Sequence, residues 1–307
     1  MHARVARILS VLLAAAVPLA LLVGLAAGLP GCRAVGPDHS QLDATAARAL
    51  VREQARALRD LSASVSLSIE TAEFEGSLSG ALVVAPPTRL RLRATKLMQD
   101  VFDLVITPEE LSLFWFRDGT FFRRRLAGDT LHPVGEGTAL PYGGTGEWED
   151  PNPEDRDPQG PEAFLAQLDP SAFRLALATF ELPLSDEASD LPANERVVFE
   201  ATERTGGDLV VRAQLASGDR LERRFDGRTL FLEEVIVTNA AGERRLRATY
   251  DDHELVQGFW LPTEMALEDA VAGTRFEMNF DEVAVNEGVL PGAFVLIPPP
   301  GVEAREL

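Results

Sequence analysis

The sequence predicts a mainly β (α+β) protein built from a single strongly curved antiparallel sheet, or unclosed β-barrel, of about 11–13 strands. Helices are expected to cover the concave side of this sheet. From residue 61 onward, apolar and polar residues alternate in many short segments, which is typical of strands with one buried face. Only residues 38–60 and 162–180 show helical three- and four-residue spacing. A meander this long must curl, because a flat sheet would expose apolar surface and unpaired edges.

The N-terminus has the features of an export signal. Arg4 and Arg7 precede a mostly apolar run that ends at Leu29-Pro30-Gly31-Cys32, with the only cysteine of the chain. This order predicts a signal peptide over residues 1–31. The final four residues resemble the lipobox of bacterial lipoproteins, which implies cleavage before Cys32, its lipidation and membrane anchoring through acyl chains. A retained transmembrane helix is the alternative, since about 20 apolar residues can span a bilayer.

Acidic residues outnumber basic ones, with 48 Asp and Glu against 29 Lys and Arg and a net charge of −19. This balance opposes nucleic-acid binding, which depends on cations that neutralise phosphates. It also repels anionic lipid headgroups, so an acyl anchor rather than a basic surface must hold the protein at a membrane. The apolar fraction of 46% is sufficient for a large core.

The mature chain is expected to begin with a lipidated tether, residues 32–40, followed by one domain over 41–307. Residues 38–60 place apolar side chains on one face and arginines on the other, which predicts an amphipathic helix. Six strands follow, near residues 63–70, 78–84, 89–95, 101–107, 111–117 and 121–126. Two β-subdomains divided by the next segment are the alternative.

Residues 133–161 interrupt the strand pattern. They are rich in Pro, Gly, Glu and Asp and lack periodic apolar residues, which predicts a solvated acidic loop; a functional lid is the alternative. Helical spacing returns over 162–180, with a break at Pro170. Seven further strands are expected at 195–203, 208–216, 219–225, 229–238, 244–251, 259–268 and 273–285.

Three motifs accompany this order of elements: RLRLRATK at 89–96, FWLPTEMAL at 259–267 and a tail from Val283 to Val302. Together with the lipobox, they resemble the LolA/LolB superfamily of lipoprotein-localisation factors. The resemblance implies an unclosed barrel whose apolar cavity, beneath a helical lid, holds the acyl chains of a lipid or lipoprotein. A lipid-anchored member resembles the receptor type, which accepts cargo at the outer membrane.

Apolar residues of the predicted sheet and of the 162–180 segment are candidates to line this cavity, with ordinary core packing as the alternative. They are Phe102, Leu104, Ile106, Leu113, Trp115, Phe164, Leu168, Phe173 and Trp260. In the receptor type, an apolar residue on the loop after the third strand helps insert cargo into the bilayer. The equivalent loop here contains Leu97 and Met98. Packing on the barrel rim is the alternative for both.

No catalytic constellation is recognisable, and the sequence predicts a protein that is not an enzyme. Residues 76–80 read Gly-Ser-Leu-Ser-Gly, with leucine where a nucleophile would stand. Residues 251–254, Asp-Asp-His-Glu, could supply metal ligands, but neighbours on a strand point to opposite faces. We therefore interpret them as a solvated strand end and expect no metal and no cofactor. Arg89, Arg91 and Arg93 are interpreted as a solvated face, with a cargo-headgroup contact as the alternative.

These patterns predict an outer-membrane, lipid-anchored protein that faces the periplasm, shields acyl chains from water and releases them beside a bilayer. A periplasmic carrier protein is a second candidate partner. Arg33 rather than aspartate follows Cys32, which by resemblance to enterobacterial sorting rules favours the outer membrane. The alternative is a structural or assembly-associated surface lipoprotein that acts by protein–protein contact and has no ligand cavity.

Overall fold

A computed structural model describes residues 36–70, 75–86, 89–126, 197–270, 273–290 and 292–306. Contacts divide the chain into two compact units, Met1–Gly36 and Pro37–Leu307, and the helix and strands below belong to the second. The predicted signal peptide, Cys32 and most of the tether lie outside the described residues. So do the acidic segment 133–161 and the helical segment 162–180.

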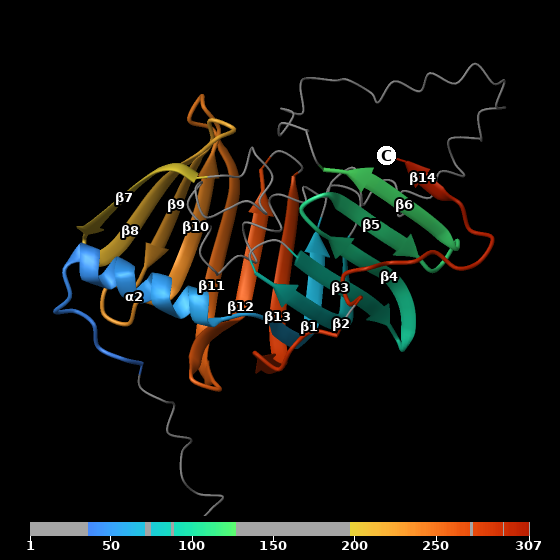
Figure 1. The fold of residues 1–307 in the computed structure, drawn as a ribbon, viewed down its shortest axis with the longest axis horizontal. Coiled ribbons are helices and arrows are strands. Elements are labelled where there is room, and N and C mark those ends of the chain that lie inside the picture. Colours follow the sequence, from blue (N-terminus) through green and yellow to red (C-terminus); the bar gives the residue numbers. More distant parts are fainter. Residues whose placement is uncertain are drawn as a thin grey trace, which may run out of the picture. The chain divides into compact units, whose positions relative to one another are not determined.

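The described part of the second unit contains one helix and fourteen strands, all in one sheet (Figure 1). The elements are α2 (Ala44–Ala57), β1 (Leu61–Glu70), β2 (Glu75–Ala85), β3 (Arg89–Lys96), β4 (Gln99–Ile106), β5 (Glu110–Trp115), β6 (Thr120–Arg125), β7 (Val197–Thr205), β8 (Asp208–Leu215), β9 (Arg220–Phe225), β10 (Leu232–Thr238), β11 (Arg244–Val256), β12 (Phe259–Asp269), β13 (Thr274–Val285) and β14 (Ala304–Glu306). Their order in the sheet is β14-β6-β5-β4-β3-β2-β1-β13-β12-β11-β10-β9-β8-β7.

The predicted mainly β architecture with a single unclosed sheet is confirmed, and three details differ. The structure has fourteen described strands, because it adds β14 to the thirteen that the sequence predicted. β14 has only three residues, which is too short for an alternating pattern to reveal. β14 pairs with β6 in parallel, so the sheet is mixed rather than wholly antiparallel. β11 runs to Val256, so residues 251–254 lie within a strand rather than at its end.

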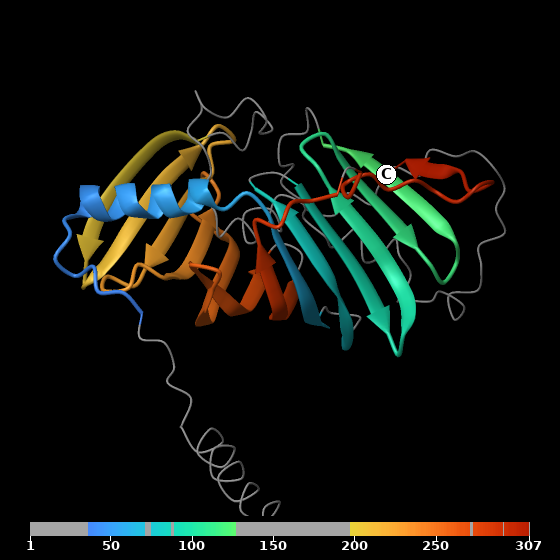
Figure 2. The ribbon, with the colours of Figure 1, turned by 60° about the horizontal axis from the view of Figure 1, so that its bottom comes forward.

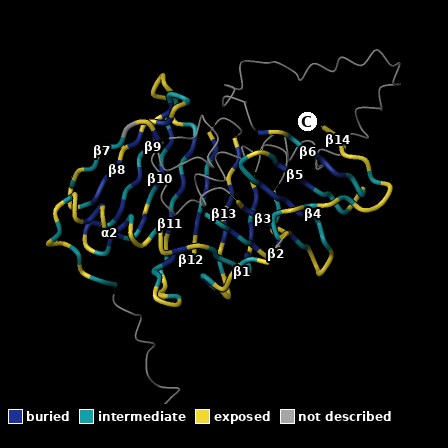
Figure 3. Tube along the Cα trace, viewed as in Figure 1, coloured by how far each residue is buried: buried dark blue, intermediate teal, exposed yellow. Residues whose placement is uncertain are grey.

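The main core lies on one face of the sheet, which we call the inner face and which carries Leu67, Leu104 and their cross-strand partners. Leu67 of β1 lies between Leu78 of β2 and Met278 of β13, and Leu104 of β4 pairs with Leu92 of β3. All five belong to the buried cluster. Each such side chain contributes about 1.5–3 kcal/mol when it leaves water. Figure 3 shows the buried positions along the strands and the exposed ones at turns.

Helix α2 lies across the end of the sheet formed by β7 and β8 (Figure 2). Its N-cap is Asp43, whose side chain accepts a hydrogen bond of 2.8 Å from the backbone N–H of Ala46. Ala47 and Val51, one turn apart, are buried in the same cluster as the strands. The predicted helix is therefore present with its apolar stripe against the inner face. Arg48 is buried on this side as well, whereas the pattern placed all the arginines on the opposite face.

The opposite, outer face of β3–β6 is covered in part by the segment that follows β13. This segment crosses β3 (Figure 2). There the Arg91 guanidinium donates to Asp103 at 2.6 Å and to the carbonyl oxygen of Ala293 at 3.0 Å. Val105 and Phe121 are buried but do not belong to the main cluster. The two faces of these strands therefore bury apolar side chains separately.

Candidate functional site

The tip of the β3–β4 hairpin presents two large apolar side chains to solvent. Leu97 is 91% exposed and Met98 is 99% exposed. Both have left-handed backbones, with φ of 52° and 66°, and together they form a two-residue turn. Such turns favour Asn-Gly, because a side chain in the left-handed region clashes with the following carbonyl and costs about 1–2 kcal/mol. The hairpin thus holds exposed apolar residues in a conformation that neither favours.

An ion pair on the outer face braces this hairpin just behind its tip. The Arg93 guanidinium of β3 donates to both carboxylate oxygens of Asp100 on β4, at 3.0 Å and 2.6 Å. The same guanidinium lies 5.5 Å from the ring centre of Phe116. The hydrogen bond from Arg93 lowers the pKa of Asp100, so this pair stays charged across the neutral range. Lys96 adds an exposed cation directly beside the tip.

Five of the predicted cavity residues lie together on the inner face of β4 and β5. Phe102, Leu104, Ile106 and Leu113 are each 0–1% exposed. Trp115 is less buried and stacks on Phe102, with 6.0 Å between ring centres and 11° between ring planes. The structure therefore gathers these side chains into one apolar cluster, which begins at Phe102 behind the Lys96–Gln99 pair of the hairpin.

Small residues on the neighbouring strands make room for this aromatic stack. Phe102 pairs with Ala94 of β3, and Ala94 pairs with Gly80 of β2. A Cβ atom at Gly80 would lie 2.2 Å from the backbone oxygen of Arg93, so the two strands approach too closely there for any side chain.

The remaining predicted cavity residues are not placed with these five. Trp260 is on β12, and its ring lies 5.0 Å from that of Phe231, which stacks on His253 at 4.7 Å. Five strands separate β12 from β5 in the sheet. Phe164, Leu168 and Phe173 lie outside the described residues.

Sequence reasoning missed a cluster of charges buried beneath α2. The Arg48 guanidinium of α2 donates to both oxygens of Glu200 on β7, each at 2.8 Å. Arg52 and Arg223 bring guanidinium nitrogens to 3.6 Å and 3.7 Å from the same carboxylate. No local sequence pattern predicts this cluster, because its members come from α2, β7 and β9.

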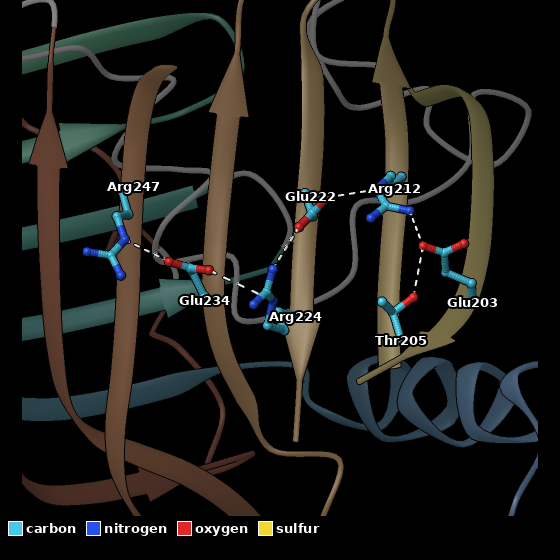
Figure 4. A network of polar contacts seen from close by, with 7 residues as sticks. All are labelled: Glu203, Thr205, Arg212, Glu222, Arg224, Glu234 and Arg247. Atoms are coloured by element: carbon cyan, nitrogen blue, oxygen red, sulfur yellow. Dashed lines mark hydrogen bonds and ion pairs between the residues drawn. The ribbon is translucent and has the colours of Figure 1, made fainter. Parts of the chain in front are cut away.

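A network of alternating charges covers the outer face of β7–β11 (Figure 4). Ion pairs and hydrogen bonds link Arg247, Glu234, Arg224, Glu222, Arg212 and Glu203 in that order. The nitrogen–oxygen distance is 2.7 Å in the first pair, Arg247–Glu234, and 3.3 Å in the middle pair, Arg224–Glu222. Exposed pairs of this kind contribute little stability. The three arginines and three glutamates of this network balance in charge.

The outer face of the central strands is hollowed into a pocket of about 390 Å³. Its walls come from β13, β1, β2 and β3, and its lining includes Ser64, Ser66, Ser79, Thr95 and Asp281. This site was not predicted, since its residues are distant in the sequence. It lies on the face opposite the predicted acyl-binding residues.

Metal ligands are not brought together in the part of the chain that the structure describes. No three His, Cys, Asp or Glu side chains there are grouped to hold a metal ion. Within residues 251–254, His253 is half-buried against Phe231, and burial lowers the pKa of its imidazole. The search for membrane-spanning helices among the described residues also finds none of sufficient length and hydropathy.

No family model and no curated protein matches the sequence. Solved structures do match, and three of them are each 10% identical in sequence to this chain. A DUF1329 family protein from Desulfovibrio piger has a TM-score of 0.51, covering 82% of this chain and 97% of that one. This chain shares its fold. A putative outer membrane lipoprotein-sorting protein domain from Vibrio parahaemolyticus has a TM-score of 0.48, covering 82% and 96%.

A LolA superfamily protein from Nitrosomonas europaea is also among the matches, with a TM-score of 0.44 and coverage of 81% of this chain and 96% of that one. The superfamily that the sequence resembles is thus represented among the matching structures. At 10% identity it is a resemblance of fold alone.

Proposed function

We propose that this protein is a lipid-anchored binding protein that holds acyl chains of a lipid or lipoprotein against its inner face and releases them at a bilayer touched by the β3–β4 hairpin. It acts by binding rather than by covalent chemistry. The proposal rests chiefly on Leu97 and Met98, two almost fully exposed apolar side chains held in left-handed backbone conformations.

A membrane would surround these two side chains with an apolar environment. Moving each from water into hydrocarbon would contribute about 1.5–3 kcal/mol. The net charge of −19 opposes contact with anionic lipids, so an apolar tip with one neighbouring cation, Lys96, is a chemically suitable point of approach. Anchoring through Cys32, with the protein facing the periplasm from the outer membrane, is part of the same proposal.

The apolar surface behind the tip supports the second half of the proposal. Phe102, Leu104 and Leu113 continue directly from the hairpin along the inner face. An acyl chain leaving this surface would reach the tip past a single polar cross-strand pair, Lys96 and Gln99. The alternative is a filled interior with an assembly role, and the buried state of these same side chains is the observation that favours it.

Site-specific fluorescence tests the membrane contact. The chain has one cysteine, so Cys32→Ser with Met98→Cys leaves a single thiol for an environment-sensitive dye and removes the acyl anchor. We expect a blue shift of the dye when phosphatidylethanolamine–phosphatidylglycerol vesicles are added. The matched control carries the dye at Glu109→Cys, in the exposed turn between β4 and β5 at the end of β4 opposite the tip, and should not shift. Equal responses at both positions would contradict the proposed contact.

Mass spectrometry of the purified full-length chain tests the binding of acyl chains. We expect stoichiometric co-purifying lipid, beyond the lipid attached to Cys32. A lipid-free preparation that also lacks the blue shift would favour the assembly role.

A further inference from the structure

The outer-face pocket owes its depth to the size of its floor residues. Ser64 and Ser66 of β1, together with Ser79, Gly80 and Ala81 of β2, form a floor of small side chains. Longer side chains stand on the flanking strands, Arg93 on β3 and Asp281 on β13. Adjacent strands lie about 4.8 Å apart, so these walls stand on backbones roughly 14 Å apart. The volume of about 390 Å³ is in the range of small-ligand sites.

A β-bulge directs two carboxylates toward this face. The register between β1 and β13 shifts between Ser62 and Ser64, and Glu282 has a left-handed φ of 50°. Both Asp281 and Glu282 are consequently exposed, although neighbours on a regular strand point to opposite faces. The Ser64 hydroxyl donates to Glu282 at 3.0 Å, which leaves Asp281 as the carboxylate that lines the pocket.

Several of the polar groups in the pocket are available to a ligand. The Thr95 hydroxyl donates to the backbone oxygen of Ser79, and Arg93 is engaged by Asp100. In the described part of the chain, the hydroxyls of Ser66 and Ser79 and the carboxylate of Asp281 hydrogen-bond to no other group. The pocket therefore offers two hydroxyls, each able to donate and accept, beside one carboxylate that only accepts.

This set of groups selects against an anion. The one arginine in the lining is neutralised by Asp100, whereas Asp281 and Glu282 add negative charge at the opposite wall. A phosphate would meet repulsion there. A neutral ligand with several hydroxyls matches better, since it can donate to the carboxylate and exchange hydrogen bonds with the serines.

We propose that this pocket binds a saccharide, either free or as the headgroup of a glycolipid. The site is on the opposite face from the acyl-binding surface and goes beyond the proposed function. Thr95 lines the pocket two residues before Leu97, so a sugar at a membrane surface would lie close to the hairpin tip. Saccharide binding does not require the acyl-binding role, and each can fail without the other.

Saturation-transfer NMR on the full-length chain tests the site, in a zwitterionic detergent without a sugar headgroup. The probes are methyl glycosides of glucose, galactose, mannose and N-acetylglucosamine. We expect at least one to bind with a dissociation constant on the order of 1 mM, as suits an open pocket with few hydrogen bonds. Absence of saturation transfer to all four would overturn the proposal.

Substitutions test whether the saccharide binds in this pocket. Ser66→Phe fills the floor and should weaken binding by at least tenfold. Ser77→Phe, on an exposed serine of the same face outside the pocket, should leave it unchanged. Asp281→Asn removes the charged acceptor and should weaken binding about tenfold. Binding that survives Ser66→Phe would overturn the assignment to this pocket.

Vesicles distinguish the two sources of the sugar. Tighter binding to vesicles of glycosyl diacylglycerol than to the free glycoside would assign a glycolipid headgroup, and equal binding would assign a free saccharide. Binding to phosphatidylglycerol vesicles and to no glycoside would contradict the pocket chemistry. Replacing Leu97 and Met98 should leave binding of the free glycoside unchanged, which separates this result from the proposed membrane contact.

Discussion

Glu200 is a carboxylate that the fold places among Arg48, Arg52 and Arg223 beneath α2. Burial raises the pKa of this carboxyl, but the hydrogen bonds from Arg48 and the charges of the three arginines outweigh burial. The resulting pKa lies below its ordinary value of 4.5. Stability from this group is therefore fully present above pH 4.5 and is lost as the pH falls through the lower pKa of the folded state.

Glu200→Gln should destabilise the protein by about 3 kcal/mol at pH 7, because Arg48 loses a bidentate partner in a buried site. Urea unfolding measures the change. The difference from the unsubstituted chain should shrink as the pH is lowered below 4.5, since protonation removes the same charge. Glu203→Gln, on the exposed network of the outer face, serves as the control and should change stability little. Equal losses in the two variants would contradict this role for Glu200.

At the scale of elements, the β3–β4 hairpin combines a strained backbone with an exposed apolar tip. Leu97 and Met98 occupy the two turn positions where Asn and Gly adopt left-handed backbones at low cost. Selection for stability alone would favour Asn and Gly at these two positions. The membrane contact proposed above would account for Leu97 and Met98 at this turn.

Replacing Leu97 with Asn and Met98 with Gly should raise the free energy of unfolding by about 1–2 kcal/mol while abolishing the membrane contact. Thermal unfolding and vesicle co-sedimentation, both on chains with Cys32→Ser, measure the two effects. A variant with alanine at both positions separates them, because it removes the apolar bulk but keeps left-handed non-glycine residues. It should lose vesicle binding without the gain in stability. Vesicle binding retained by both variants would refute the contact.

At this scale the sequence predicted the strands well and the sites poorly. Alternation identifies β1 because Val65, Leu67 and Ile69 all face one core, which is a local property. It also marked the 97–98 loop. The pocket depends on Ser64, Ser79 and Asp281, which lie on three strands, and only the register brings them together. The exposure and backbone strain at the hairpin tip likewise appear only in three dimensions.

At the scale of the whole molecule, β14 covers part of the edge of β6. Ala304 to Glu306 pair in parallel with Phe121 to Arg123, and the Arg305 guanidinium lies 6.0 Å from the ring centre of Phe122. Uncovered strand edges invite pairing with other chains. This short strand therefore acts as a cap for one end of the described sheet.

A chain truncated after Val302 should self-associate more readily than the complete chain, because its β6 edge is uncovered. Sedimentation velocity across a range of protein concentrations measures the effect. Arg305→Ala keeps the backbone of β14 and should behave as the complete chain does. Identical sedimentation of the truncated and complete chains would argue against a capping role.

The pairing of β1 with β13 sets the order in which the strands of this chain can assemble. Leu61 pairs with Val285, and the backbone N–H of Arg59 bonds to the side chain of Asn286, 227 residues along the sequence. The middle of the sheet is thus a seam between the first strand and the last long one. Because the chain is synthesised from its N-terminus, β1 can pair with β13 only after nearly the whole chain has been made. Contacts this distant slow folding and prolong exposure to aggregation, so a chaperone that binds unfolded chains would have its clearest target in the strands of that seam.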